Sequence, residues 1–544
     1  MSTRLISFVA SLFLSVAGCS SESGGGGGQP PPPPPPVTKA EAFQFLNQAA
    51  FGATEDEAQQ VISMRFEAWI DDQLLKPASL QLPHIQSLPL PQFMAELQAD
   101  RVDIWFRNAL HGEDQLRQRV AFALSEIMVV SQLGVLNNQP YSLASFYDTL
   151  AQNAFGNYRD LIEEVTLHPA MGVYLSMLGN EKPDVANNIR PDENYARELM
   201  QLFSIGLVEL DLDGSVSTDT QGQPIPTYDQ AVIEEFAHVY TGWTYAGSPV
   251  FRGARATLTS QVIPMQLWQS YHDTGSKTLL NGFTIPAGQQ GGQDLAMALD
   301  NVFNHPNVGP FMAIRLIQRL VTSNPSPAYV SRVASVFNNN GRGVRGDLGA
   351  VVRAILLDPE ARPAMPMDLD GKIKEPLLRL TQLWKSYNAT SQTGRYPLNF
   401  AYIVFGQGPL QASHVFNFFS PFYAPPGEIQ DGGLVAPELE IATEYLNTYV
   451  TNYMFYQTFG LNSTNQNLQP DDVYINFEEE MAVAADVDAL IDMVTGKLLG
   501  GEITDTLRNE IAGMLALIPA TETALRAAET IYFVVTSPEY AHQR

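Results

Sequence analysis

The segment 191–203 carries the best candidate for chemistry in this chain, because it places two carboxylates and a guanidinium on one predicted helix. Glu193 and Arg197 are four residues apart, so their side chains are neighbours on the helix surface, and Glu198 lies on the adjoining face. Glu198 has the chemistry of a general acid or base, and Arg197 that of an anion-binding group. The same residues could instead tie neighbouring helices together through buried ion pairs, which is the more frequent outcome for such groups. Both interpretations stay open.

His272 and Asp273 form the second candidate site, in a glycine-rich connection followed by Lys277. A histidine beside a carboxylate can bind a metal or transfer a proton, although a histidine whose ring bonds to loop carbonyls is commoner. Residues 275–278 superficially match a phosphate-binding loop, but its first glycine and its glycine-lysine order are missing, so we reject that interpretation. The predicted catalytic set is therefore Glu193, Arg197, Glu198, His272 and Asp273.

Three acidic residues, Glu209, Asp211 and Asp213, approximate the spacing of a calcium-binding loop. The twelfth position of that loop is Thr220, which lacks the bidentate glutamate that such loops need. A hairpin turn at Asp213-Gly214 explains the same residues, and we prefer it. Calcium at this loop stays as the alternative, and it is the one cofactor that the sequence suggests.

Three further histidines have a structural interpretation. His168 and His305 each precede a proline at the end of a predicted helix, where a histidine can bond the last carbonyls of the helix. His238 shares a predicted helix face with Glu234, but two residues do not make a zinc site. The sequence assigns no catalytic role to these histidines.

The elements that must position these side chains are mostly helical, because apolar residues recur at intervals of three and four between Asp, Asn, Gly and Pro boundaries. Two small hairpins are expected, one at 208–216 and one formed by 255–268 and 278–285. The prediction is a mainly α fold, a large multi-helix body with one or two small β-hairpin insertions. The expected helices cover residues 43–50, 54–77, 114–130, 160–167, 192–205, 229–240, 294–303, 311–321, 329–337, 348–357, 438–456, 486–499, 504–516 and 521–535.

The first 37 residues predict export and a lipid anchor. Arg4 precedes an apolar run, 5–17, that is too short to span a bilayer permanently. Small residues then precede Cys19, the only cysteine in 544 residues, and this pattern resembles the lipobox of bacterial lipoproteins. That resemblance implies that Cys19 becomes the first mature residue and carries acyl chains such as palmitate; an ordinary signal peptide is the alternative.

A tether follows the cysteine. Residues 20–29 are glycine-rich and flexible, and residues 30–36 are an unbroken proline run that extends about 20 Å as polyproline II. Ser20 after the cysteine, by the resemblance to lipoproteins, implies the outer membrane of a two-membrane bacterium. The predicted organisation is a signal peptide at 1–18, acylated Cys19 and tether at 19–37, and a helical body at 38–544 that could divide into lobes of about 38–245 and 290–544.

Composition narrows the function classes. The net charge of −27 argues against nucleic acid and against adhesion to anionic lipid, since both need a basic surface. A hydrophobic content of 45% is ample for a packed core. With its one cysteine acylated, the chain has no thiol left for a disulfide or a thiolate metal site. No nucleophile elbow, dinucleotide fingerprint or His-Glu-x-x-His motif is present.

Nine segments of the body resemble one bacterial family, catalogued as domain of unknown function 1800. The strongest is PDENYARELMQLF at 191–203, and motifs of this length in one order are rarely accidental. The resemblance covers nearly the whole body from about residue 40. The matching segments are 45–54, 168–171, 174–175, 191–203, 241–243, 272–277, 305–306, 416–421 and 433–438.

The resemblance implies an exported, mostly helical protein of a family whose activity is not established. Members are often encoded beside a second exported family that resembles sulfatase-like hydrolases, which implies a working partner of that kind. One segment departs from the family: where many members are rich in aromatic residues and histidine, this chain has Ala-Leu-Ser-Glu-Ile-Met at 123–128. A metal role for that segment therefore does not transfer.

Two hypotheses follow. The leading one is a lipid-anchored cell-envelope protein that binds or assembles with an exported partner or glycan, and it favours a non-enzymatic role without deciding it. The alternative is a hydrolase or lyase of an envelope or extracellular polymer that uses the predicted catalytic set. Convergence of Glu198, Arg197, His272 and Asp273 on one pocket would favour the enzyme, and separate ion pairs away from any cleft would favour the binding protein.

Overall fold

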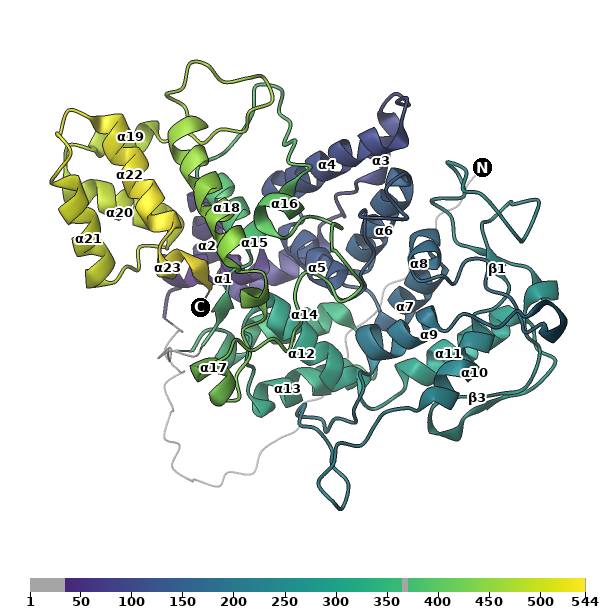
Figure 1. Cartoon of the computed structure of the whole chain (residues 1–544). Helices are drawn as coiled ribbons and strands as arrows, with labels where there is room; N and C mark the ends of the chain where they lie inside the picture. The colour runs from purple at the N-terminus through teal and green to yellow at the C-terminus, as the bar shows by residue number, and fades with distance from the viewer. Residues whose placement is uncertain (1–34, 364–369, 544) are drawn as a thin grey trace, which may run out of the picture. The chain divides into compact units, whose positions relative to one another are not determined.

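The computed structural model describes residues 35–363 and 370–543. The predicted signal peptide, Cys19 and residues 19–34 of the predicted tether therefore lie outside the described residues. The described residues from Val37 onwards form one compact unit, which we call the body. Helices account for 53% of the structure, with 23 α-helices and only two-stranded sheets in the described ranges (Figure 1). The predicted mainly α fold with small β insertions is confirmed.

The body begins with two capped helices, α1 (Lys39–Ala49) and α2 (Glu55–Leu75), which pack against each other. Each starts with a capping box, in which the N-cap threonine and a glutamate three residues later bond to each other's backbone N–H. The sequence predicts this box for Thr54 and Glu57. Arg65, inside α2, has a positive φ of 68°, so the backbone kinks there.

The centre of the body consists of helices buried on almost every face. These are α4 (Leu97–His111), α5 (Gln115–Ser125), α6 (Pro140–Asn153), α12 (Val308–Leu320) and α15 (Pro376–Ser386). Trp105 of α4 packs edge-on against Phe106, whose ring lies 5.2 Å from that of Trp384 in α15. One contiguous apolar cluster joins these helices to α1, α2 and most of the helices that follow.

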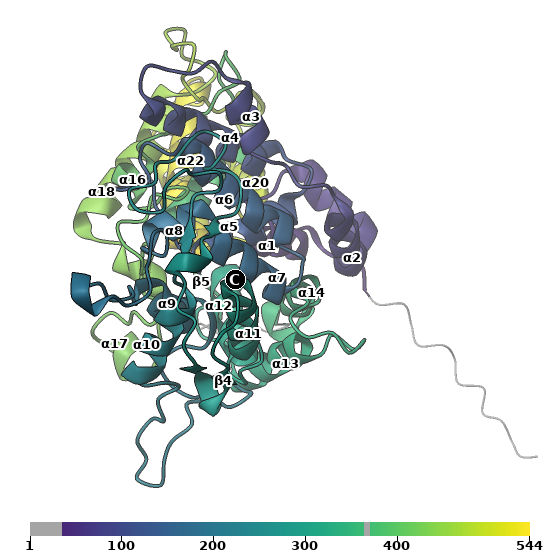
Figure 2. The ribbon, with the colours of Figure 1, turned by 90° about the vertical axis from the view of Figure 1, so that its right-hand side faces the viewer.

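Helices α12, α13 (Pro327–Asn338) and α14 (Leu348–Leu357) pack side by side (Figure 2). Helices α19 (Glu478–Val483), α20 (Val487–Leu498), α21 (Asp505–Leu515) and α22 (Thr523–Val535) form another group, yellow in Figure 1.

The remaining described helices are of three kinds. The α-helices among them are α3 (Leu82–Ser87), α7 (Tyr158–Leu167), α8 (Pro169–Tyr174), α9 (Asn194–Glu198), α10 (Gln230–Val239), α11 (Gly291–Phe303), α16 (Ala401–Phe405), α17 (Glu428–Asp431), α18 (Glu444–Phe455) and α23 (Pro538–Ala541). The π-helices are η3 (Leu199–Ser204) and η8 (Tyr456–Gly460), and the short 3-10 turns are η1 (Met94–Glu96), η2 (Val185–Asn187), η4 (Gln269–Tyr271), η5 (Leu280–Gly282), η6 (Pro359–Ala361) and η7 (Pro437–Glu440).

Most of the expected helices begin and end within four residues of the expected bounds, and the one expected at 192–205 is α9 followed by the π-helix η3. Two others differ more. The helix expected at 114–130 ends as α5 at Ser125, because Glu126 leaves the helix to bond with Gln407 and Asn417 in the core. The helix expected at 438–456 is broken after η7 and restarts as α18, where Thr443 accepts a hydrogen bond from the Leu446 N–H as the N-cap.

The strands are short. Strand β1 (Trp243–Thr244) pairs with β2 (Gln266–Leu267), β3 (Lys277–Thr278) with β4 (Thr284–Ile285), and β5 (Lys372–Ile373) with β6 (His542–Gln543), all antiparallel. The hairpin expected at 208–216 is confirmed by the bridge between Leu210 and Val216, and this loop projects from the body (Figure 1; Figure 2).

The second expected hairpin is only partly correct. Residues 278–285 do form one, as β3 and β4, but residues 255–265 make no strand, and 266–267 pair with β1 instead. Within residues 35–363 and 370–543, every helix falls short of the length and apolar content that crossing a membrane would take.

Candidate functional site

Glu198 is the last residue of α9, and the chain continues directly into the π-helix η3. Irregular turns of this kind are frequent at functional sites. The residue is 6% exposed, and its Oε2 atom is buried with no hydrogen-bond partner among the described residues. Burial raises the pKa of Glu198, while the nearby charge of Arg197 opposes the shift. A carboxyl group with a raised pKa suits the role of a general acid.

Two tyrosines share this environment with Glu198. Burial is the main cause that raises the pKa of Tyr174 to about 12, and the charge of Glu198 adds to it. Burial also raises the pKa of Tyr228 to about 12. The charge of Arg197 acts to lower this pKa, and the charge of Glu198 acts to raise it. The Tyr228 hydroxyl is buried without a partner in the described ranges. The group therefore holds two unused polar atoms that a ligand or water could bind.

Glu193 and Arg197 form the ion pair that their spacing predicts, with 3.0 Å between Oε2 and Nη2. Both side chains are about one-third exposed, at 34% and 39%. The Gln230 amide, in the first turn of α10, donates to Glu193 at 2.9 Å. This pair therefore links α9 to α10 at the surface, where such pairs contribute little to stability.

His272 lies in a closed, fully buried network. Its Nε2 is 3.1 Å from the Asp294 carboxylate, and its Nδ1 is 3.0 Å from the Thr241 carbonyl. The Lys277 ammonium donates to the same Asp294 oxygen at 2.7 Å. Because these partners surround the imidazole and exclude solvent, this geometry matches the structural interpretation of a satisfied core histidine.

Asp273 faces a different partner. Its Oδ2 lies 2.5 Å from Nδ1 of His238 in α10, and both side chains are partly exposed, at 19% and 28%. The hydrogen bond from His238 is the first cause that lowers the pKa of Asp273 to about 2. A carboxylate that holds one ring nitrogen orients the imidazole and leaves the other nitrogen for proton transfer. The sequence analysis gave His238 no such role, since no local spacing connects residues 238 and 273.

The predicted catalytic residues form separate groups in the described structure. Glu193, Arg197 and Glu198 lie together on α9, whereas His272 and Asp273 point into two other networks. Gln230 and His238 stand eight residues apart on α10, which is about 12 Å along the axis. No hydrogen bond or ion pair in the ranges 35–363 and 370–543 joins Glu198 to His272 or Asp273. Their catalytic roles stay predictions.

The acidic hairpin holds its carboxylates by local bonds. Asp213 accepts from the Ser215 N–H and hydroxyl at 3.0 and 2.6 Å, and Asp211 accepts from the Ser217 hydroxyl at 3.1 Å. Glu209 lies 3.7 Å from Nε2 of His305. Among the described residues, no group of three or more His, Cys, Asp or Glu side chains is arranged to hold a metal ion. Calcium at Glu209, Asp211 and Asp213 stays a prediction that is without support from this geometry.

A buried charge cluster, which the sequence analysis missed, lies in the core of the body. The Lys372 ammonium contacts the carboxylates of Glu438 at 2.9 Å and Glu375 at 3.2 Å, and Nη1 of Arg319 is 3.7 Å from Oε2 of Glu126. These residues are buried together with Arg119, so three cations face three carboxylates away from solvent. The cluster consists of Arg119, Glu126, Arg319, Lys372, Glu375 and Glu438.

Two amides complete the cluster. Gln407 donates to Glu126 at 3.2 Å and to Glu375 at 2.5 Å, and Asn417, at a positive φ of 70°, donates to Glu126 at 3.4 Å. Burial raises the pKa of Glu126, against the charge of Arg319. For Glu375, burial also acts to raise the pKa, but the cations of the cluster outweigh it and the pKa is lowered. The pKa values of the two carboxyl groups therefore shift in opposite directions.

One sequence signal points to this cluster in retrospect. Asn417 and Glu438 come from segments that carry the family resemblance, 416–421 and 433–438, and Glu126 comes from the segment that departs from it. The members are up to 319 residues apart in the chain, so no local spacing could have joined them.

One known protein family matches almost the whole body. A family model matches residues 44–542, and the family is described as a protein of unknown function (DUF1800). Curated proteins and solved structures give no match. The resemblance of the nine sequence segments is thus confirmed at the level of the family, over far more than half of the chain. The chain belongs to the family described as Protein of unknown function (DUF1800).

Proposed function

We propose that this is a lipid-anchored protein of the bacterial cell envelope whose helical body binds a glycan, with an exported partner protein as the second class of ligand. The proposal rests on an exposed aromatic face of α18 and η8. Tyr445, Tyr449 and Tyr456 are 57%, 41% and 52% exposed, and the rings of Tyr445 and Tyr449 lie 4.5 Å apart. Their spacing of four and seven places them on one helix face with exposed Asn452. We call these four residues the aromatic stripe.

The chemistry of the aromatic stripe favours a neutral glycan. Between residues 441 and 460 the only charged side chain is Glu444, although the chain has 58 acidic and 31 basic residues. Exposed rings offer flat apolar surface, and the tyrosine hydroxyls and the Asn452 amide offer hydrogen bonds to sugar hydroxyls. The stripe extends about 16 Å at 1.5 Å per residue, which is long enough for several linked sugar rings.

An exported protein partner is the other class of ligand, because exposed aromatic patches with few charges are also typical of protein interfaces. A sulfatase-like partner of the kind that the family resemblance implies fits this description. Support for the envelope location comes from the sequence of the first 37 residues, above all from Cys19. A Cys19→Ser variant should leave the membrane fraction, and wild-type protein that stays soluble after export would contradict the anchor.

The test of binding uses full-length protein in detergent and affinity electrophoresis in gels that contain neutral or acidic envelope polysaccharides. A Tyr445→Ser, Tyr449→Ser double variant should lose at least about tenfold in affinity, which corresponds to about 1.4 kcal/mol. A Phe93→Ser variant, which also removes an exposed ring, is the matched control and should bind normally. Unchanged glycan binding by the double variant would contradict the glycan proposal, and loss of co-purification with an exported protein alone would favour the partner.

A hydrolase or lyase of an envelope polymer is the second candidate function. One observation favours it. Glu198 stands at the junction of α9 and η3, and its buried Oε2 has no hydrogen-bond partner among the described residues. Tyr228 adds a buried hydroxyl in the same condition. An acid with a raised pKa beside an anion-binding arginine is the equipment that polymer cleavage by acid–base catalysis requires.

A further inference from the structure

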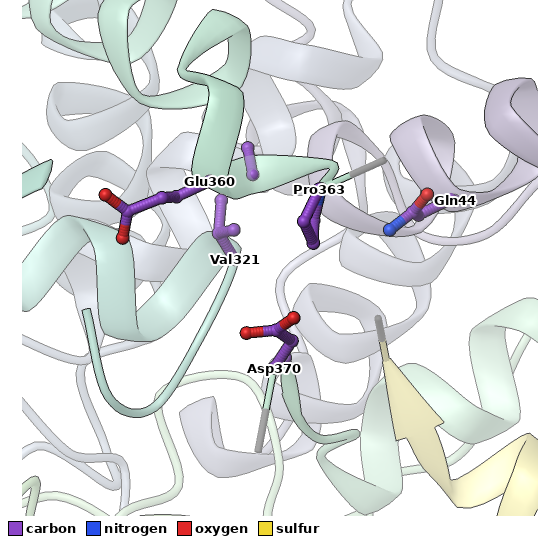
Figure 3. Close-up of a pocket in the computed structure, with 7 residues that line it drawn as sticks. Gln44, Val321, Glu360, Pro363 and Asp370 are labelled. Carbon is purple, nitrogen blue, oxygen red and sulfur yellow. The ribbon is translucent and has the colours of Figure 1, made fainter. Parts of the chain in front are cut away.

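A cavity of about 580 Å³ lies between the first helix of the body and its last strand. Its wall includes residues of α1, the loop that follows α20, α23 and β6, together with Lys374. This volume is within the range of small-molecule sites in proteins. A neighbouring hollow, which shares Gln44 and Pro363 with it, encloses only about 10 Å³ and holds no more than one water (Figure 3).

Lys374 is the unusual member of the cavity wall. It is 3% exposed, and it forms no ion pair within residues 35–363 and 370–543. Its Nζ donates to the amide oxygen of Gln382 at 2.5 Å and lies 4.5 Å from the ring centre of Tyr540. Burial, helped by the charge of Arg379, lowers the pKa of Lys374 to about 7. A large share of this amine is therefore neutral at neutral pH.

Lys372, two residues earlier, has the opposite surroundings. It is equally buried, but its Nζ contacts the carboxylates of Glu375 and Glu438 and the carbonyl of Arg319. Those contacts pair Nζ with two carboxylates and a carbonyl and so occupy its N–H donors. Four lysines are buried among the described residues: Lys277, Lys372 and Lys385 each form an ion pair, whereas Lys374 forms none and lines this cavity.

We propose that Lys374 is the nucleophile of a covalent binding site in this cavity, which takes a hydroxylated aldehyde or ketone. The neutral Nζ attacks the carbonyl carbon, and the C–N bond forms as the carbonyl oxygen takes a proton. The carbinolamine then loses water, which carries away the oxygen and both amine hydrogens, and leaves an imine that water can reverse. His542 lines the same cavity and provides an imidazole for these proton transfers.

The other lining residues select the ligand. Thr38, Asn47 and Thr504 offer hydroxyl and amide groups, and Glu502 offers a carboxylate. These groups can bond to the hydroxyls of a ligand, which a purely apolar carbonyl compound does not have. The hydroxyls of Thr38 and Thr504 already donate to Glu41 and Glu539, so each would accept from a ligand hydroxyl. The open-chain form of a small sugar has the required chemistry. This site is independent of the aromatic stripe and of Glu198.

The experiment traps the imine on full-length protein with glycolaldehyde and sodium cyanoborohydride at pH 7, followed by peptide mass mapping. An ordinary lysine amine, with a pKa of about 10.4, is almost wholly protonated at pH 7, so Lys374 should be labelled at least about tenfold faster than exposed Lys182. Labelling of Lys374 at the rate of Lys182, or no labelling, would overturn the proposal. Preference for hexanal over glycolaldehyde would overturn the ligand class.

Two variants serve as controls. Lys374→Arg should lose the label in its own peptide and leave that of Lys182 unchanged, and Lys372→Arg should leave the label on Lys374. Should either variant fail to fold, the wild-type protein still decides the question through pH. Labelling of Lys374 should rise through about pH 7, and a rise only near pH 10 would contradict the neutral amine.

Discussion

Oε2 of Glu126 and Nη1 of Arg319 lie 3.7 Å apart at a point of the core where neither side chain reaches solvent. Glu126 stands where α5 ends, and Arg319 stands near the end of α12. The guanidinium of Arg319 also packs over the ring of Phe419 at 4.5 Å. This contact therefore fixes three segments of the chain that are far apart in sequence.

Replacing Arg319 with methionine should destabilise the body strongly. The substitution leaves three carboxylates of the buried charge cluster against two cations, and breaking a buried pair costs about 3–5 kcal/mol. Urea unfolding followed by circular dichroism measures the loss. Arg353→Met, which removes a surface pair with Asp71, is the control and should cost about 0–1 kcal/mol. Equal losses in the two variants would show that the cluster does not stabilise the core.

Stability should fall in mild acid because of His168. Burial lowers the pKa of His168 to about 3, and its Nδ1 accepts a hydrogen bond from the Ala170 N–H at 3.1 Å, which requires a neutral ring. The folded pKa lies below the unfolded value of 6.5, so this stability is complete above pH 6.5 and decreases as the pH falls towards 3. The loss at pH 5 should be about 2 kcal/mol.

The control for this pH dependence is His168→Asn, which keeps a hydrogen-bond acceptor at the N-cap of α8 but cannot titrate. Its free energy of unfolding should change less between pH 7 and pH 5 than that of the wild type. The pKa of His305 is lowered to about 4, also first by burial, so a smaller slope of the same sign should remain. A variant with the full wild-type slope would exclude His168 as the cause.

Glu198→Gln tests the enzyme hypothesis. The variant should fold with a stability within about 1 kcal/mol of the wild type, because Oε2 has no partner to lose among the described residues. Turnover of envelope or extracellular polymers, followed by release of reducing or unsaturated ends, should drop at least about 100-fold. Glu193→Gln is the control with a smaller expected effect. Full activity in Glu198→Gln would remove this residue from the catalytic set.

Gly242→Ala should disturb the network around His272. Gly242 has a φ of +87°, and an added Cβ would lie 3.0 Å from both the backbone nitrogen and the Cβ of His272. Gly247→Ala is the matched control, since its φ is +72° and its added Cβ would have open space. Chemical unfolding should show a loss of about 1 kcal/mol for the control and at least about 2 kcal/mol for Gly242→Ala. Equal losses would mean that the close approach is tolerated.

Much of the fold follows from local sequence patterns. The helix expected at 348–357 has these bounds in the structure, as α14, because Asp347 caps one end and the amphipathic period is clear. Helices α4, α6 and α15 were not among the expected ones. In these helices polar residues such as Arg101 and Asp103 are buried together with apolar ones, so the chain shows no separate polar face.

In the candidate site, too, local contacts could be predicted from the sequence and tertiary contacts could not. The pair of Glu193 and Arg197 is a matter of helical spacing and could be predicted. The pairing of His238 with Asp273, 35 residues later, depends on how α10 packs against β3, and that is a tertiary relationship. The histidines at 168 and 305 were expected as helix-ending caps. His168 does end α7, but its ring accepts from the first turn of α8 instead.

The pairing of β5 with β6 has a consequence for the order in which the body assembles. The Lys374 N–H donates to the Ala541 carbonyl, and the Gln543 amide donates to the Leu320 carbonyl, both at 2.7 Å. Helix α1 packs against β6 as well. The contact of α1 with β6 therefore joins residues almost five hundred positions apart, and this part of the packing can form only after nearly the whole body has been synthesised.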